Sequence, residues 1–239
     1  MTSELRGGVA LVAGASQGIG AAISLALADA GMTVWMVART AAALERAAAR
    51  VGPGARPFVA DLTDPVARAA LVDAVAAERR ALDVLVHSAG ITHLGRIDEA
   101  SEDEFREQVE GNVLAPYALT RSCLAQLRKS QGQIVFINSS AGKTANPGVG
   151  QYSATQHAAR AIADSLRAEV NADGVRVTVI HPGRTASPRQ ATIHAIENRP
   201  YAPERLMQPS DVAAVVLAAL RLPRTAEVTE ISLRPMLKS

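Results

Sequence analysis

The stretch VALVAGASQGIGAAISLALADAG, residues 9–31, joins an apolar run to an alanine-rich segment through a turn that contains Gly14, Gly18 and Gly20. The run is typical of a buried strand, and the segment is typical of a helix. Glycines let the backbone of such a turn approach a phosphate, and the following helix offers free N–H groups at its positive end. A tight turn with a purely structural role could have the same sequence. The position of this turn between the first strand and a helix favours a nucleotide site.

The same alternation continues along the chain. Apolar runs that predict strands lie at residues 9–14, 33–38, 55–60, 83–88, 133–138, 176–181 and 228–234. Segments that predict helices lie between them, at residues 18–30, 40–50, 64–80, 101–129, 152–171 and 210–221. Continuous apolar strands that alternate with helices are typical of a parallel sheet covered on both faces. We therefore expect one α/β domain over residues 1–239, doubly wound around a parallel seven-stranded sheet.

Composition argues against several classes of protein. The 239 residues have a net charge of +2, and no dense run of Lys or Arg indicates a nucleic-acid partner. The single cysteine, Cys123, excludes an intrachain disulfide and suits a reducing cytoplasm, and its helical context predicts a packed side chain. The N-terminus MTSELRGG has no apolar signal region, and no apolar run reaches membrane-spanning length. The histidines show no metal-ligand spacing, so we expect no metal site. The other features predict a cytoplasmic protein with no membrane partner.

The residues after the second predicted strand bear on cofactor choice. Enzymes that use NAD usually have a carboxylate there, near the ribose 2′-hydroxyl, whereas here Ala38 is neutral and Arg39 follows it. A guanidinium suits a 2′-phosphate through its charge and its paired donors, and Ser16 and Thr40 could add hydroxyl contacts. The sequence therefore predicts NADP(H), with a solvated surface arginine as the alternative interpretation.

Asp61, after the third predicted strand, has two interpretations. Its carboxylate could accept a hydrogen bond from the adenine amino group. It could instead cap the helix that begins at Pro65, a role for which Asp64 is equally suited.

Seven short motifs resemble, in order, those of a known family. They are AGASQGIG (13–20), ADLTD (60–64), HSAG (87–90), Asn112 in EGNVLAP, INSSAG (137–142), YSATQ (152–156) and HPGRTAS (181–187). Together they resemble the short-chain dehydrogenase/reductase family over nearly the whole chain. The resemblance implies that the doubly wound sheet is of the Rossmann type. It also implies an NAD or NADP cofactor and hydride transfer between its nicotinamide and a small-molecule carbonyl or alcohol. Many members are homotetramers or homodimers that pack through helices corresponding here to residues 101–129 and 152–171.

The resemblance also implies roles for individual residues. Ser139 would polarise the substrate carbonyl and Tyr152 would be the general acid or base. Asn112 would hold a water in a proton relay, or would only mend a helix kink, and Gln156 completes the catalytic set. The residues expected to contact the cofactor are Gly14, Ser16, Gln17, Gly18, Ile19, Gly20, Arg39, Thr40, Asp61, Leu62, Ser88, Ala89, Gly90, Tyr152, Gln156, Pro182, Gly183, Thr185 and Ser187.

Three positions depart from the family pattern. The glycine turn opens with Ala13 where the family usually has threonine, and His87 and Ser88 replace two asparagines. We expect rearranged hydrogen bonds between these two strands, and a structural role for His87 in preference to a functional one. The third departure is Gln156, which stands where the family motif Tyr-x-x-x-Lys has its lysine.

The amide at position 156 changes what the site can do. The family's lysine contacts the nicotinamide ribose, and a glutamine can partly replace this contact because its amide donates and accepts hydrogen bonds. It cannot supply the lysine's charge, and a nearby opposite charge typically moves a pKa by roughly 1–3 units. The phenol of Tyr152 should therefore keep its proton at neutral pH, which suits carbonyl reduction and hinders alcohol oxidation. Lys143 or Arg184 could supply the missing charge.

Three functions remain open. An NADP(H)-dependent carbonyl reductase, in a natural or an engineered Gln156 form, is favoured because Ser139, Tyr152 and Asn112 are retained. The alternatives are a non-redox enzyme, such as a dehydratase, isomerase or cyclase, and a catalytically inactive NADP-binding protein. Residues 188–209 mix apolar side chains with arginines and predict a loop over an apolar or mildly anionic substrate, although an ordinary connection would have similar letters.

Overall fold

The computed structural model describes residues 5–79 and 81–237, which form a seven-stranded sheet in the order β3-β2-β1-β4-β5-β6-β7. All neighbouring strands are parallel. The strands are β1 (Val9–Ala13), β2 (Thr33–Ala38), β3 (Ala55–Val59), β4 (Val84–His87), β5 (Gln133–Ile137), β6 (Arg176–Pro182) and β7 (Glu230–Leu233). The predicted Rossmann-type fold and its strand number are confirmed.

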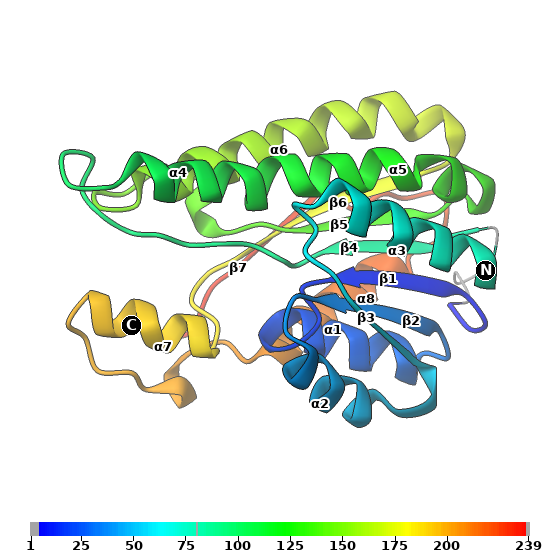
Figure 1. Ribbon diagram of the computed structural model, residues 1–239, viewed down its shortest axis with the longest axis horizontal. Coiled ribbons are helices and arrows are strands. Elements are labelled where there is room, and N and C mark those ends of the chain that lie inside the picture. Colours follow the sequence, from blue (N-terminus) through cyan, green and yellow to red (C-terminus); the bar gives the residue numbers. More distant parts are fainter. Residues whose placement is uncertain (1–4, 80, 238–239) are drawn as a thin grey trace.

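Helices cover both faces of the sheet. They are α1 (Gly18–Asp29), α2 (Ala41–Val51), α3 (Pro65–Glu78), α4 (Glu102–Val109), α5 (Ala115–Ser130), α6 (Gly150–Val170), α7 (Pro188–Ile196) and α8 (Pro209–Leu220). Figure 1 shows α3, α4, α5 and α6 on one side of the sheet, with α1, α2 and α8 on the other and α7 set apart beyond the strands. None of the helices in the described ranges has both the length and the hydrophobicity that a membrane span requires.

The two helical layers explain why the strands are continuously apolar. Successive strand residues point to opposite faces. On β1, Ala10 and Val12 belong to the core beneath α1, α2 and α8, while Val9 and Leu11 belong to the core beneath α3, α5 and α6. Because both faces are covered, the strand has no solvent side that would require polar residues.

Two segments differ from the sequence-based expectation. The helix predicted over residues 101–129 is divided by a π-helical turn, η2 (Glu110–Leu114). The segment 188–209, expected as a loop, contains α7 and a short 3₁₀ turn at Pro203–Arg205. Residue 80 of the predicted helix 64–80 lies outside the described residues, as do residues 1–4 and 238–239 of the predicted domain.

Strand order places a crevice between β1 and β4. From β1 the chain adds β2 and β3 on one side, and it then returns to place β4 on the other side. The connections that leave the carboxyl ends of β1 and β4 therefore run in opposite directions. In open α/β sheets, ligands bind at this point.

Candidate active site

A cleft of about 440 Å³ opens at the carboxyl ends of the strands. The predicted site residues that line it are Gly14, Ser16, Gln17, Gly18, Ile19, Arg39, Thr40, Asp61, Leu62, Ser88, Ala89, Gly90, Ser139, Tyr152, Gln156, Pro182, Gly183, Thr185 and Ser187. Two further predicted residues, Gly20 and Asn112, are described by the structure but do not line the cleft. One cavity thus brings together segments from most of the length of the chain.

Each of the three positions of the first turn suits a glycine for a different physical reason. Gly14 has φ of +82°, and a Cβ there would lie 2.5 Å from the backbone nitrogen of Ala89. A Cβ at Gly20 would lie 2.1 Å from the carbonyl oxygen of Gly14, so this glycine is required for packing and not for cofactor contact. Gly18 faces the cleft, where its Cβ would lie 3.7 Å from the Cβ of Ser187.

The N-terminus of α1 is suited to an anion. Its N-cap residue, Gln17, makes no side-chain capping bond in the described chain, and the first turn of the helix contains no acidic residue. The first N–H groups of a helix lack partners within the helix, and this end has a partial positive charge. Because Gln17, Gly18 and Ile19 line the cleft, these groups are available for a phosphate.

The far end of the cleft contains Arg39 and Asp61. The Asp61 carboxylate accepts hydrogen bonds from the backbone nitrogen of Thr63 at 3.0 Å and from its hydroxyl at 2.8 Å. The Thr63 backbone bond, with smaller help from its hydroxyl and from Arg39, lowers the pKa of Asp61 even though burial opposes this change. Asp64, and not Asp61, caps α3 by accepting from the backbone nitrogen of Val66 at 2.9 Å. Asp61 is therefore an ionised acceptor facing the cleft.

The other end of the cleft contains Ser139, Tyr152 and Gln156. Asn138, which the sequence did not single out, connects them. Its amide oxygen accepts from the Ser139 backbone nitrogen at 2.7 Å, and its amide nitrogen donates to the Gln156 carbonyl at 2.9 Å. The Ser139 hydroxyl oxygen accepts from the backbone nitrogen of Ala141 at 3.1 Å. The hydroxyl donates to no group in the described part of the chain, so its proton is available for a hydrogen bond to a ligand.

The buried side chain of His181 contacts the backbone of Ser139. His181 on β6 has its Nδ1 3.0 Å from the Ser139 carbonyl oxygen and its Nε2 3.6 Å from Glu230 Oε1. Burial lowers the pKa of His181, so the ring favours its neutral form. Glu230 also accepts from Lys143 at 3.2 Å and from Arg160 at 2.5 Å. Although burial alone would raise the pKa of Glu230, these two cations lower it. The contacts tie β7 to the loop that contains Ser139.

Comparison with known proteins places this geometry in a family. Residues 8–198 match the model of the short chain dehydrogenase family. The chain belongs to the short-chain dehydrogenase family. It is 33% identical to a glycine betaine reductase of Emericella nidulans over 97% of this chain, which corresponds to only 19% of that protein's length.

Solved structures of oxidoreductases resemble the whole chain. An alcohol dehydrogenase of Thermococcus sibiricus, complexed with 5-hydroxy-NADP, has a TM-score of 0.86 at 28% identity and covers 97% of this chain and 98% of its own. A 3-ketoacyl-(acyl-carrier-protein) reductase of Brucella melitensis, complexed with NADH, has a TM-score of 0.86 at 26% identity and covers 95% of this chain and 98% of its own.

Gln156 stands where the short-chain dehydrogenase resemblance predicts a lysine. Its side chain is buried and lines the cleft. Of the two cations considered as replacements, Lys143 does not line the cleft and is paired with Glu230. Arg184 lines the cleft, but its guanidinium is 2.8 Å from a carboxylate oxygen of Glu197. Neither side chain is therefore a free charge that could replace the lysine.

His87 occupies the strand position next to Ala13, its partner in the β1–β4 pairing. Its ring stacks on Phe136 with centroids 4.7 Å apart, and its Nε2 lies 2.7 Å from the Thr120 hydroxyl oxygen. Burial lowers the pKa of His87 to about 3, so the ring is neutral at physiological pH. These contacts support the structural interpretation of His87, and they show that its hydrogen bond goes to a helix and not to β1.

Asn112 has a positioning role in this structure. It lies in the π turn η2, and its amide oxygen accepts from the Ile91 backbone nitrogen at 2.7 Å. Its amide nitrogen donates to the Ile91 carbonyl at 2.8 Å and to the Thr155 hydroxyl at 3.0 Å. The side chain therefore fastens the segment after β4 to α6 beside Gln156. With its amide engaged by protein groups, the side chain does not reach the cleft.

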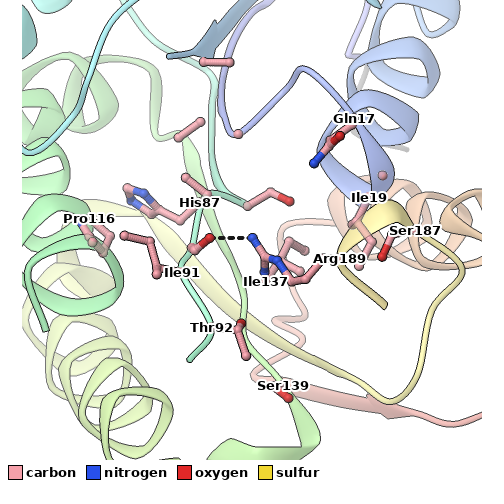
Figure 2. Close-up of a pocket in the computed structure, with 18 of the residues that line it drawn as sticks. Gln17, Ile19, His87, Ile91, Thr92, Pro116, Ile137, Ser139, Ser187 and Arg189 are labelled. Carbon is pink, nitrogen blue, oxygen red and sulfur yellow. Dashed lines mark hydrogen bonds between the residues drawn. The ribbon is translucent and has the colours of Figure 1, made fainter. Parts of the chain in front are cut away.

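Arg189 and Thr92 are among the cleft residues that the sequence analysis did not assign to the site. Arg189, near the start of α7, donates a hydrogen bond through its guanidinium to the carbonyl of Gly90, and Figure 2 shows this bond crossing the cleft. The hydroxyl of Thr92 is buried and has no hydrogen-bond partner in the described chain, although its residue lines the cleft. Pro188 after Ser187 was a readable signal for the start of α7, whereas no local pattern indicated Thr92.

The segment after β6 is held close to the cleft by its own contacts. Ser187 caps α7 by accepting from the backbone nitrogen of Gln190 at 3.1 Å. His194 is buried against the Tyr201 ring, with centroids 5.4 Å apart, and the Tyr201 hydroxyl lies 3.2 Å from the Ser187 backbone nitrogen. Ile193 faces the cleft from the same helix. The segment is thus an ordered cover with an apolar inner side chain.

Proposed function

We propose that the chain is an NADP(H)-dependent carbonyl reductase. The proposal rests on one observation: Arg39, preceded by the neutral Ala38, lines the same cleft as Ser139 and Tyr152. A site for a 2′-phosphate and a pair of proton-donating hydroxyls therefore share one cavity. The expected substrate is a small carbonyl compound, and the expected compartment is the cytoplasm.

The cleft residues fit the parts of a dinucleotide. The first turn of α1 suits the diphosphate, Arg39 and Thr40 suit the 2′-phosphate, and the Pro182–Gly183 turn with Ser187 suits the nicotinamide end. The two structural neighbours have different cofactors, so they do not decide between NAD and NADP. The charge at Arg39 favours NADP. When bound, the cofactor supplies the hydride.

The chain's own residues would handle the oxygen of the substrate. Ser139 would donate a hydrogen bond through its hydroxyl to the carbonyl oxygen and keep its proton, while its own oxygen accepts from the backbone nitrogen of Ala141. Tyr152 would give its phenolic proton to the same oxygen as negative charge develops there. A neutral phenol is sufficient for this step. The Gln156 amide could bond the ribose, and with no cation in its place reduction is favoured over oxidation.

Exchange of Arg39 tests the cofactor assignment. We expect the wild-type protein to bind NADPH more tightly than NADH. Arg39→Asp should weaken NADPH binding and should narrow or reverse the preference, because it replaces the phosphate's charged donor with an acid. A hydrogen bond to a charged group contributes about 1.5–3 kcal/mol, or roughly 10- to 100-fold in Kd. Fluorescence titration with both cofactors would measure the change. A wild-type preference for NADH, or an unchanged preference in the variant, would contradict the assignment.

The amide at position 156 supports a second candidate function. A tyrosine without a neighbouring cation is a weak base, which is compatible with a non-redox enzyme on this scaffold or with a protein that only binds NADP. Consumption of NADPH with a panel of aldehydes and ketones would support the reductase. Product formation without cofactor turnover would support a non-redox enzyme, and tight binding without reaction would support a binding protein.

A further inference from the structure

The charged side chains that line the cleft differ in how they are compensated. Arg184 is paired with Glu197, and Asp61 is hydrogen-bonded to Thr63 and lies near Arg39. Arg189 is different, because no ion pair among the described residues includes it and its contact is the neutral carbonyl of Gly90. A guanidinium has five N–H donors and suits anions that accept in pairs. Arg189 therefore brings to the cleft a positive charge that the protein does not balance.

Arg189 lies where the N-termini of α7 and α1 come close together. It is the second residue of α7, whose N-cap is Ser187. The Cβ of Ser187 lies 3.7 Å from the position that a Cβ of Gly18, the first residue of α1, would occupy. The guanidinium lies 3.9 Å from the corresponding position at Gly90. Figure 2 shows the side chain reaching from Ser187 across the cleft toward the segment after β4.

The expected position of the cofactor identifies the anion. Arg39 marks the 2′-phosphate, while Ser139 and Tyr152 mark the reaction centre, so the diphosphate lies between them at the N-terminus of α1. We propose that Arg189 binds the diphosphate of the cofactor, an inference that rests on the function proposed above. In the structure its guanidinium donates to the neutral carbonyl of Gly90, an acceptor that the phosphate oxygens of the cofactor would replace. Since Arg189 belongs to α7, the same contact fastens the cover over the bound cofactor.

Binding measurements with two ligands separate this role from the adenosine contacts. NADPH contains the diphosphate, whereas adenosine 2′-monophosphate contains the 2′-phosphate without it. Arg189→Gln should raise the Kd for NADPH by about 10- to 100-fold, the range expected for charged hydrogen bonds, and should leave the Kd for adenosine 2′-monophosphate unchanged. Arg39→Gln should weaken both ligands. Arg189→Lys keeps the charge without the paired donors and should recover part of the NADPH affinity.

The matched control is Arg205→Gln. This arginine belongs to the same segment and is exposed, but it does not line the cleft. The Arg205→Gln variant should bind both ligands as the wild type does. Thermal unfolding of each variant would show that the fold is retained.

Several outcomes would overturn the inference. If Arg189→Gln leaves NADPH affinity unchanged beside tight wild-type binding, Arg189 does not bind the diphosphate, although the proposed function stands. If it instead raises only the KM of a carboxylate-bearing carbonyl substrate, Arg189 binds the substrate. Equal weakening of adenosine 2′-monophosphate would indicate a general disturbance of the cleft. Failure of the wild type to bind either NADPH or NADH would overturn the proposed function and this inference together.

Discussion

A lysine at position 156 would combine two properties, a hydrogen bond to the ribose and a positive charge near Tyr152. Gln156 can supply only the first. The residue lines the cleft, and an amide can hydrogen-bond a ribose, but it brings no charge to Tyr152. The structure also shows that Lys143 and Arg184 are paired with Glu230 and Glu197. At the scale of single residues, the proposed reaction centre therefore keeps Tyr152, its expected proton donor, but lacks the cation that would make this group a good base.

Restoring the charge should change the two reaction directions unequally. Gln156→Lys should favour the phenolate of Tyr152 and raise oxidation rates near neutral pH, by up to the roughly 10²–10⁴-fold typical of positioned acid–base catalysis. Reduction should gain less, because a neutral phenol already supplies its proton. The measurement is a pH–rate series in both directions with one carbonyl and alcohol pair, where the acid limb for oxidation should move to lower pH.

Two controls define this experiment. Ala70→Lys adds the same charge to an exposed position of α3 and should leave both rates unchanged. Tyr152→Phe should remove activity with either residue at position 156. If Gln156→Lys has no effect on either direction, the amide has its own role and a non-redox reaction becomes the better explanation. If Tyr152→Phe is harmless, Tyr152 is not the acid.

His87 gives stability a predictable dependence on pH. Burial lowers its pKa in the folded chain to about 3, against 6.5 for the free group. Between these values the unfolded chain takes up a proton that the folded chain does not, so stability is full above pH 6.5 and falls as the pH decreases toward 3. The slope for one proton is about 1.4 kcal/mol per pH unit.

Removal of the imidazole should remove that slope. Urea unfolding of the wild type and of His87→Gln between pH 5 and 7, about the range in which this group begins to titrate, would compare the two free energies of unfolding. The variant should be less stable at pH 7, because the contacts with Phe136 and Thr120 are weakened. The difference between the proteins should shrink as the pH falls. A constant difference would show that His87 accepts a proton in the folded state.

At the scale of elements, the strands were predictable because their surroundings are simple. β1, β4 and β5 are covered on both faces, and this burial produces short apolar runs that are visible in the sequence. The division between α4 and α5 was not predictable from such a pattern. A π turn keeps the amphipathic composition of the helix, and only the alternative interpretation of Asn112 as a residue at a kink pointed to it. In the structure Asn112, within this turn, accepts a hydrogen bond from Ile91, which lies far away in the chain.

The site was predictable in outline for a related reason. Gly14, Arg39 and Ser139 follow directly after strands, and the carboxyl ends of parallel strands meet at one edge of the sheet. Arg189 was missed because its segment was expected to be a loop. The contribution of Asn138 was missed because a hydrogen-bonding bridge between a loop and a helix depends on their relative positions, which local sequence does not specify.

At the scale of the whole molecule, one helical layer has two exposed apolar side chains close together. α4, α5 and α6 lie together on one side of the sheet (Figure 1). Near the start of α5, Leu114 and Tyr117 are 48% and 50% exposed and lie three residues apart, which places them on one side of the helix. Large exposed apolar side chains grouped in this way are typical of a protein interface. They coincide with the helices through which the family resemblance predicts association.

We therefore propose that the chain forms a homodimer or homotetramer through α5 and α6, with Tyr117 near the centre of one interface. Tyrosines at such positions often contribute about 2 kcal/mol or more, which is roughly 30-fold in dissociation constant. Tyr117→Glu, which also places a charge in the contact, should shift the protein toward the monomer in multi-angle light scattering at micromolar concentration. Val66→Glu, at a 77% exposed position on α3, is the matched control and should keep the wild-type mass. A monomeric wild type would contradict the proposal. An equal loss of mass in both variants would assign the interface to a different surface, because a charge on α3 would then disturb association as much as one on α5.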